Sequence, residues 1–388
     1  MKEIKGYADP NNLLNPGVII NEHADAHIRH LKKLPTVESE VDTCIECGFC
    51  EHKCPSRHLT LTPRKRIVVR RALKSLQHEG EGKLHKELLQ QYQYDGLDTC
   101  AVDGLCATAC PVDIDTGKLV KRLRSEKHSA FGNGVAKWIA RNFSFILSLV
   151  KFALRTGNFL NRIFGKKFMF RFTKMIRKII PAFPLWSNHL HAAPSIKKLQ
   201  RLHKDKSPHS IVYIPACINR LMGEAKSSQH VSKHFSEVAL KSGIKLYIPA
   251  DIAGSCCGQI FSSKGYKGAY NFKVNQFIEK LWTWSGEGER PVVIDFSSCV
   301  YTVLQSPGTL TDENRERLKN MQILETVQFI KYHILPIAPT IEKKKRNCCA
   351  SGLFDGKNEY AIDTRGCSWR FCRGSSDPCK CGMLWNGR

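Results

Sequence analysis

Residues 207–346 alternate between short apolar runs and longer segments with helical periodicity. The runs SIVYIPAC, IKLYIPADIAGSCCG and RPVVIDFSSC are separated by SSQHVSKHFSEVALKSG and NFKVNQFIEKLWTW. Short apolar runs bounded by turn residues are typical of buried strands, and a 3.6-residue period is typical of helices. We therefore predict an α/β domain with a parallel sheet over this part of the chain.

Residues 30–128 show a helical pattern instead. In TPRKRIVVRRALKSL, Thr62 stands at a capping position and Pro63 at the first helical position. A capping residue followed by proline is a typical start of a helix. KLHKELLQQYQY continues with helical periodicity after Gly80 and Gly82, so the first module is predicted to be helical.

Residues 129–206 combine positive charge with aromatic side chains. Between Glu126 and Asp205 the chain has 16 lysines and arginines and no acidic residue. The uncharged run Asn142 to Val150 is far shorter than the roughly 20 residues that cross a bilayer. We expect a basic amphipathic helical linker that either lies on a membrane as a peripheral contact or packs on a neighbouring protein domain.

Composition changes this picture in two respects. A chain of 388 residues with 42% apolar residues can build two or three cored domains. It has 17 cysteines, but it opens MKEIKGYADP with no apolar signal segment, so we expect a reducing, cytoplasmic location, with or without contact to the inner membrane face. The net charge of +25 indicates an anionic neighbour.

Two cysteine runs, CIECGFCEHKCP at 44–55 and CAVDGLCATACP at 100–111, are one motif used twice. Only Cys47 lacks a cysteine counterpart, because Asp103 stands in its place. The spacing C-x2-C-x2-C-x3-C-P fits iron–sulfur clusters, with the fourth cysteine of each run serving the other cluster. By that rule one 4Fe-4S cluster is held by Cys44, Cys47, Cys50 and Cys110, and the second by Cys54, Cys100 and Cys106 with Asp103 at its fourth corner.

Zinc is the alternative metal, but it favours paired CxxC knuckles. The role of Asp103 stays open from sequence. It is either an oxygen ligand to a labile iron, or a non-ligand that leaves a three-iron cluster or a water-bound corner. A third interpretation has Asp103 capping the turn before Gly104, with no second cluster.

Four further cysteines follow the predicted strands. Cys217 comes after the first run, Cys256 and Cys257 after the second, and Cys299 after the third. Functional loops of open parallel sheets gather at the carboxyl edge of the strands, so these thiols are predicted to converge in a metal or redox site. The histidines His58, His85 and His230 are predicted to lie on the surface.

These motifs resemble the carboxyl-terminal half of FAD-linked oxidases of the D-lactate dehydrogenase (cytochrome) and glycolate oxidase iron–sulfur type, over about residues 1–346. IKGYADPNNLLNPGVII is similar to the last strand and turn of the flavin-oxidase cap domain. The two cysteine runs resemble that family's two-cluster ferredoxin, and IAGSCCGQIFSSKGY and DFSSCVYT resemble its cysteine-rich CCG domain. The implied domains are a cap-domain end at 1–25, a ferredoxin at 30–128, the basic linker at 129–206 and a CCG domain at 207–346.

The resemblance implies an FAD-linked dehydrogenase of D-2-hydroxy acids that passes electrons singly through clusters to a cytochrome or quinone. FAD and the substrate would bind a domain that this chain lacks, so we expect no catalytic residue here and expect that FAD-binding domain as the partner. A third cluster or a metal is expected in the CCG domain. Cys299 is followed by Val300, Tyr301 and Thr302 where many CCG domains have CxxC, so a four-thiolate site must borrow a ligand.

Two other functions remain as alternatives. One is a separate iron–sulfur subunit, as in glycerol-3-phosphate dehydrogenase or heterodisulfide reductase complexes, although a cap-domain segment at the start argues against it. The other is a basic nucleic-acid-binding metalloprotein, which the net charge keeps open. We favour electron transfer and expect no nucleic-acid partner.

Residues 347–388 have no apolar periodicity and follow the run Glu342-Lys343-Lys344-Lys345. Shifting the reading by one nucleotide permits a second CCG motif near Met383, where the family has one. We interpret 347–388 as a frameshifted tail. Its cysteines, which would then not be ligands, are Cys348, Cys349, Cys367, Cys372, Cys379 and Cys381.

Overall fold

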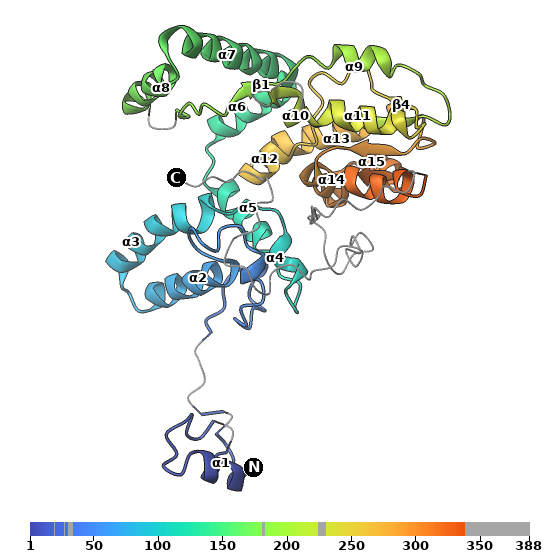
Figure 1. The fold of residues 1–388 in the computed structure, drawn as a ribbon. Coiled ribbons are helices and arrows are strands. Elements are labelled where there is room, and N and C mark those ends of the chain that lie inside the picture. Colours follow the sequence, from blue (N-terminus) through green and yellow to red (C-terminus); the bar gives the residue numbers. More distant parts are fainter. Residues whose placement is uncertain (19, 27, 30–33, 181–182, 224–229, 338–388) are drawn as a thin grey trace.

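The computed structural model describes residues 1–18, 20–26, 28–29, 34–180, 183–223 and 230–337. Figure 1 shows a helical module built around α2 to α5, an α/β domain, and a group of helices, α6 to α8, that runs along one end. The predicted frameshifted tail and its six cysteines lie outside the described residues.

The first module is helical, as its periodicity predicted. Its helices are α2 (Pro63–His78), α3 (Gly82–Tyr92), α4 (Leu105–Thr108) and α5 (Thr116–Glu126), with a 3-10 turn at Glu51–Lys53 and a π-helical turn at Gln93–Asp98. Thr62 caps α2, since its side chain accepts a hydrogen bond from the backbone N–H of Lys65. Ile67, Leu97 and Val120 lie in the small core that holds these helices together.

The second domain is an α/β unit around a parallel sheet. Its strands are β2 (Ile211–Ile214), β4 (Leu246–Tyr247), β5 (Val292–Ile294) and β6 (Ile323–Glu325), in the order β4-β2-β5-β6. All three strand pairs are parallel, so the predicted parallel sheet is confirmed. The pattern analysis missed β6, whose apolar run is only Ile323 and Leu324, between Gln322 and Glu325.

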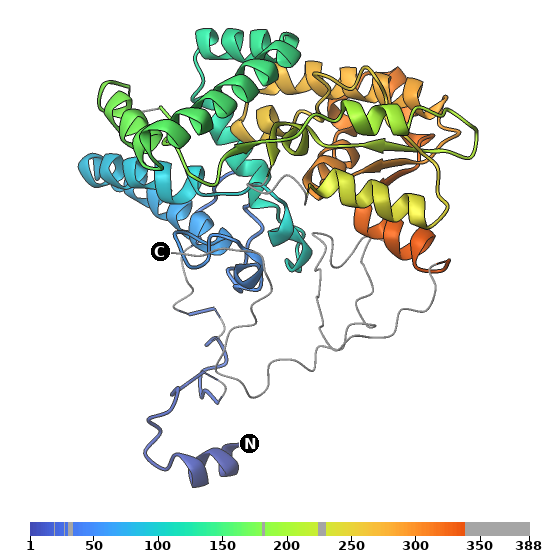
Figure 2. The same ribbon diagram turned by 45° about the horizontal axis from the view of Figure 1, so that its top comes forward.

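Helices cover both faces of this sheet (Figure 2). They are α10 (Cys217–Leu221), α11 (Val231–Lys241), α12 (Gln259–Lys264), α13 (Lys267–Ser285), α14 (Ser297–Leu304), α15 (Asp312–Lys319) and α16 (Thr326–Phe329), followed by a π-helical turn at Ile330–Ile334; Pro307–Thr309 forms a 3-10 turn. Alternate strand residues enter different cores: Val212 packs with α13 on one face, and Tyr213 packs with α11 and α16 on the other.

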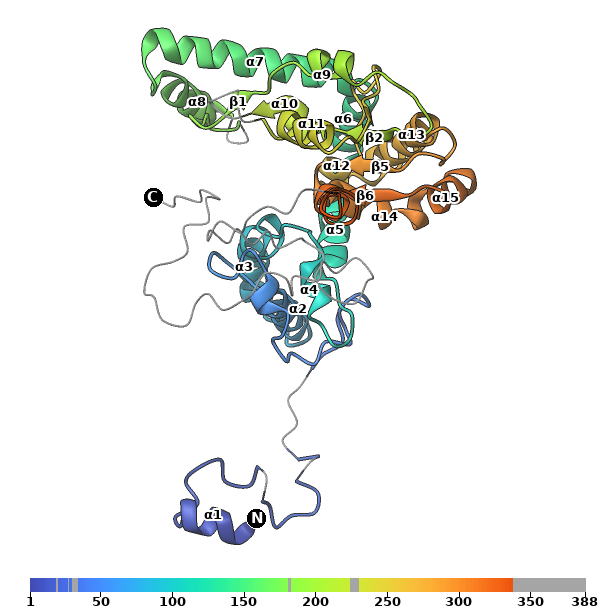
Figure 3. The same cartoon turned by 45° about the vertical axis from the view of Figure 1, so that its right-hand side comes forward.

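The basic segment between these units is mostly helical. It contains α6 (Ala130–Arg141), α7 (Phe143–Phe164), α8 (Phe168–Ile179) and α9 (Lys197–Leu202), and the short strand β1 (His191–Ala192) pairs antiparallel with β3 (Met222–Gly223). Figure 3 shows α7 and α8 side by side at the end of the molecule far from α1. Gly157 lets α7 pack closely against Trp186, because a Cβ at position 157 would lie 2.3 Å from the Trp186 ring.

Two sequence-based expectations differ from the structure. The segment likened to the last cap-domain strand is a helix, α1 (Lys2–Ala8), with no buried residue. A strand needs a neighbouring strand, and α1 instead gains a local ion pair, 2.8 Å between Lys5 Nζ and Asp9 Oδ2. His230 is buried rather than on the surface; it is 7% exposed, and its Nε2 lies 2.7 Å from the carbonyl oxygen of Asn219.

Candidate iron–sulfur sites

The two cysteine loops share an unusual backbone. The third residue of each loop has a positive φ, 58° at Glu46 and 56° at Val102, and the fifth residue is a glycine, with φ 86° at Gly48 and 74° at Gly104. A β-branched residue such as Val102 rarely adopts this conformation. Both runs therefore share the same loop conformation, and Asp103 occupies the position that Cys47 has in the first loop.

The first site is a hollow lined by all four thiols that the spacing rule assigned to one cluster. Cys44, Cys47, Cys50 and Cys110 border it, together with apolar side chains such as Ile67 and Ile114. Burial raises the pKa of the Cys50 thiol to about 11 and also raises the pKa of the Cys44 thiol. Four thiols around one apolar hollow fit the donor set of a 4Fe-4S cluster. Ligation of iron by these four cysteines is a prediction.

Helix α2 holds the first cysteine loop in place with arginines. Arg71 pairs with Glu46 at 2.7 Å, and both side chains are less than 10% exposed. The same guanidinium donates to the carbonyl oxygen of Cys44 at 2.9 Å. Arg64 pairs with Glu51 at 2.9 Å at the mouth of the hollow. From the sequence, these arginines were considered only as part of the net charge. In the structure, they contact the loop that carries the predicted ligands.

The second set of predicted ligands gathers around another arginine of α2. Cys54 is 7% and Cys106 is 6% exposed. Arg66, itself 1% exposed, donates to the carbonyl oxygen of Gly96, and its Nη1 lies 3.8 Å from Cys54 Sγ. Its charge also acts on Cys100 and Asp103.

The Nη2 atom of Arg66 is buried and has no hydrogen-bond partner among the described residues. A buried donor without a partner is costly, and the sulfur atoms of an anionic cluster would accept from it. The second set of side chains thus fits a cluster as well, with Arg66 as its counter-charge.

Asp103 caps the turn that leads into α4. The backbone N–H of Leu105 donates to Asp103 Oδ1 at 3.1 Å, as the capping interpretation predicted. Burial raises the pKa of this carboxyl group. A capping Oδ1 leaves Oδ2 for iron, so capping and ligation are compatible, and the open corner is still one of the alternatives.

The thiols of the second domain converge as the strand pattern predicted. Cys217 begins α10, Cys256 and Cys257 precede α12, and Cys299 lies in α14. The Sγ atoms of Cys217 and Cys256 are 3.5 Å apart, and Cys257 interacts with both Cys256 and Cys299. The four thiols therefore form one contiguous group at the carboxyl edge of the sheet.

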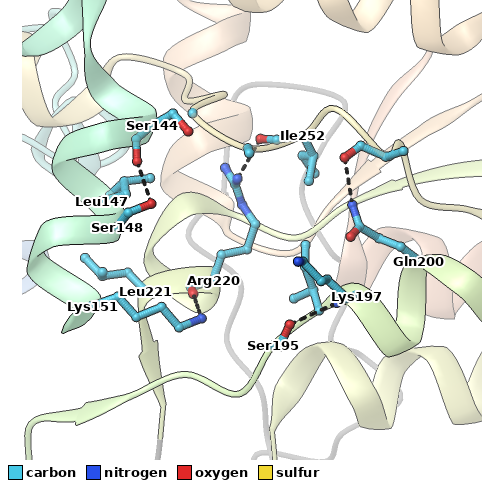
Figure 4. A pocket seen from close by; sticks show the side chains of 14 residues that line it. Ser144, Leu147, Ser148, Lys151, Ser195, Lys197, Gln200, Arg220, Leu221 and Ile252 are labelled. Atoms are coloured by element: carbon cyan, nitrogen blue, oxygen red, sulfur yellow. Dashed lines mark hydrogen bonds between the residues drawn. The ribbon is translucent and has the colours of Figure 1, made fainter. Parts of the chain in front are cut away.

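Charged side chains that the sequence did not single out surround this group. Arg220 donates to the backbone carbonyls of Pro215, Ile252 and Ser255, and it interacts electrostatically with Cys217 and Cys299. Figure 4 shows Arg220 between the α7 side and the loop that carries Ile252.

Lys273 and Asp295 are the other charges near the thiols. Lys273 is 3% exposed, and burial lowers the pKa of its ammonium group to about 8. Asp295 accepts hydrogen bonds from the Tyr213 hydroxyl at 2.8 Å and the Ala216 N–H at 2.6 Å, which fixes the turn before Cys217. In the sequence, the only indication that Asp295 belongs to this site was its position directly after an apolar run.

The two sulfur-rich sites meet through Tyr301. This residue lies on α14, two positions after Cys299, and a Cβ placed on Gly104 would be 2.2 Å from its hydroxyl oxygen. Burial raises the pKa of the Tyr301 hydroxyl, with smaller contributions from Asp115 and Cys106. A cavity of about 420 Å³ opens beside this contact. Glycine is required at position 104 both for its φ and for this close approach.

Arginine contacts reinforce the same junction. Arg124 of α5 donates to the carbonyl oxygen of Cys100 at 3.0 Å and to that of Ser263 in the second domain. His128 stacks on Tyr266, with ring centroids 3.9 Å apart. Arg124 thus links the loop of Asp103 to the α/β domain.

Comparison with known proteins supports the first module. Residues 40–114 match the family model described as 4Fe-4S dicluster domain. This segment is a 4Fe-4S dicluster domain. Neither the curated proteins nor the solved structures gave a significant match to the chain. Within the described ranges, no three His, Cys, Asp or Glu side chains stand close enough to one point to hold a single metal ion.

Proposed function

We propose that the chain is the iron–sulfur electron-transfer portion of an FAD-linked dehydrogenase of D-2-hydroxy acids, of the D-lactate or glycolate type. The dicluster domain implies iron–sulfur electron transfer. The flavin partner rests on the sequence resemblance, and so do the hydroxy-acid substrate and the cytochrome or quinone acceptor. A flavin takes two electrons from its substrate, and clusters carry electrons singly, so the two kinds of centre complement each other.

The observation that carries the proposal is the contact between Tyr301 and Gly104. It joins the second cysteine loop of the dicluster domain to the helix that carries Cys299. The predicted order of centres is the first cluster, the second cluster and the thiol group of the α/β domain. Iron bound at either site of the dicluster domain would be held by thiolates. At the second of these two sites, Asp103 or an outside ligand would complete the set, and Arg66 would offset the negative charge of the cluster.

The clusters are tested by anaerobic reconstitution of the full chain with iron and sulfide. We expect about two clusters on the dicluster domain, because seven of its eight ligand positions are thiols. Low-temperature EPR and iron and sulfide analysis measure them. A colourless preparation that binds zinc in place of iron would support the metalloprotein alternative and contradict the proposal.

The dehydrogenase context needs a separate test. The full chain is combined with an FAD-binding domain encoded beside it, and D-lactate or glycolate is added under anaerobic conditions. We expect the visible absorbance of the clusters to bleach and an added cytochrome to be reduced. Clusters that load normally but are reduced by neither hydroxy acid would contradict the flavin context and leave the electron-transfer role intact.

One observation favours the second candidate, a separate iron–sulfur subunit. The argument against it was the likeness of the first residues to a cap-domain strand, and the structure has helix α1 there. In that case the chain would copurify with a flavoprotein encoded as a distinct polypeptide. The genomic sequence on both sides of the reading frame distinguishes a fused flavin domain from a separate one.

A further inference from the structure

Helix α7 presents an apolar stripe to solvent. Phe145, Leu149, Phe152, Phe159 and Ile163 are 63%, 52%, 68%, 60% and 56% exposed. Their spacings of three, four and seven residues place them within about 80° of the helix circumference, at about 100° per residue. A surface helix normally turns such a stripe toward a core, so this one lacks a covering partner among the described residues.

Helix α8 extends the stripe beyond the turn. Phe168, Phe172, Met175 and Ile179 share one face by the same periodicity, and Ile179 is 81% exposed. The ring centroids of Phe164 and Phe168 are 4.9 Å apart, and those of Phe168 and Phe172 are 6.4 Å apart. The apolar surface is therefore continuous from the end of α7 into α8.

Positive charge borders this apolar surface. No acidic residue occurs from Lys127 to Lys204. The exposed cations of α7, α8 and their connecting turn are Arg155, Arg162, Lys166, Lys167, Arg171, Lys174, Arg177 and Lys178. Exposed aromatic and aliphatic side chains beside basic ones are typical of helices that lie in an anionic lipid interface.

We propose that α7 and α8 together dock the protein on an anionic lipid surface, with both helices lying in the plane of the membrane. The apolar stripe enters the region between headgroups and acyl chains, and the lysines and arginines contact the lipid phosphates. We favour an anionic lipid surface over a protein surface of average composition, because the negative lipid phosphates complement the positive charge of α7 and α8. Docking is a property of these two helices and does not depend on the substrate or the electron path.

The contacts of α7 explain why it lies on the membrane rather than across it. By length and composition Phe143–Phe164 is the one helix in the described part of the chain that could span a bilayer, with a mean hydropathy of 1.2. However, its inner face is bonded to other parts of the protein. Lys151 Nζ donates to the carbonyl oxygen of Arg220 at 3.1 Å (Figure 4), and Gly157 packs against Trp186. Crossing the bilayer would break these contacts.

The test uses the full chain and sedimentation with vesicles, either of phosphatidylcholine alone or with added phosphatidylglycerol. We expect binding to the anionic vesicles and little binding to the neutral ones. Replacing both Lys166 and Lys167 by Gln is expected to weaken binding about 25-fold, since each basic residue near the surface contributes a factor of about 5. The matched control replaces Lys83 and Lys86, which are exposed on α3 of the dicluster module, by Gln and leaves binding unchanged.

A second variant tests the apolar half of the surface. Phe152→Ser with Phe159→Ser is expected to weaken binding, while Leu202→Ser, at a side chain 63% exposed on α9, has no effect. Circular dichroism confirms that each variant is folded. Any of three results overturns the proposal: equal binding to neutral vesicles, retention on vesicles through molar salt as for a spanning helix, or lipid-free dimers that the double serine variant abolishes.

Discussion

Substituting Gly104 by Ala tests the junction between the two domains. Two costs add at this position. A φ of 74° puts alanine in the left-handed region, at about 1–2 kcal/mol. The new Cβ would also lie 2.2 Å from the Tyr301 hydroxyl and 2.8 Å from its Cζ, so Tyr301 must move, at about 1–3 kcal/mol for overpacking. The free energy of unfolding is expected to fall by about 2–5 kcal/mol.

The first cysteine loop supplies the matched control. Gly48 has a φ of 86°, and its nearest neighbour to an added Cβ is Arg64 Nε at 3.7 Å, an ordinary contact. Gly48→Ala therefore carries only the backbone cost, about 1–2 kcal/mol. Urea unfolding of both variants, each made also with Tyr301→Ala, measures the difference. In the Tyr301→Ala background the two alanines are expected to cost the same; if the difference persists there, Tyr301 does not pack on Gly104.

Three further outcomes concern the clusters themselves. If Asp103 leaves an open corner, Asp103→Cys converts an oxidised three-iron EPR signal into that of a cubane; an unchanged spectrum would exclude a role for this residue. Arg66→Met removes a buried positive charge, so redox titration should show a lower potential for the second cluster, whereas Arg57→Met, at an exposed site, should leave both potentials unchanged. Burial raises the thiol pKa of Cys50 to about 11 and of Cys106 to about 12; because the thiolate is the ligand, iron uptake should strengthen as pH rises from about 7 to 9, and pH-independent uptake would contradict this.

The cysteine loops and the parallel sheet were predictable because their signals are local. A spacing of two and three residues fixes how thiols face one centre, and an apolar run followed by cysteine fixes a place at the sheet edge. Thr62 and Pro63 likewise predicted where α2 begins. These features need no knowledge of which elements pack together.

The rest depended on contacts between distant parts of the chain. The approach of Tyr301 to Gly104 joins residues almost 200 positions apart, and nothing near either residue signals it. Arg66 reads in sequence as one more positive charge, yet it is buried beside Cys54. His230 lies in a polar stretch, yet it is buried, and its ring contacts the backbone of Asn219 in α10.

The shared backbone of the two cysteine loops bears on how this motif diverges. Glycine four positions after the first cysteine, and a left-handed residue two positions after it, are kept in both copies, while one thiol has been exchanged for a carboxylate. Loop length and chain direction are thus constrained more strictly than ligand identity. A copy that had lost a second cysteine would still be recognisable by its glycine, and a single inserted residue would erase it.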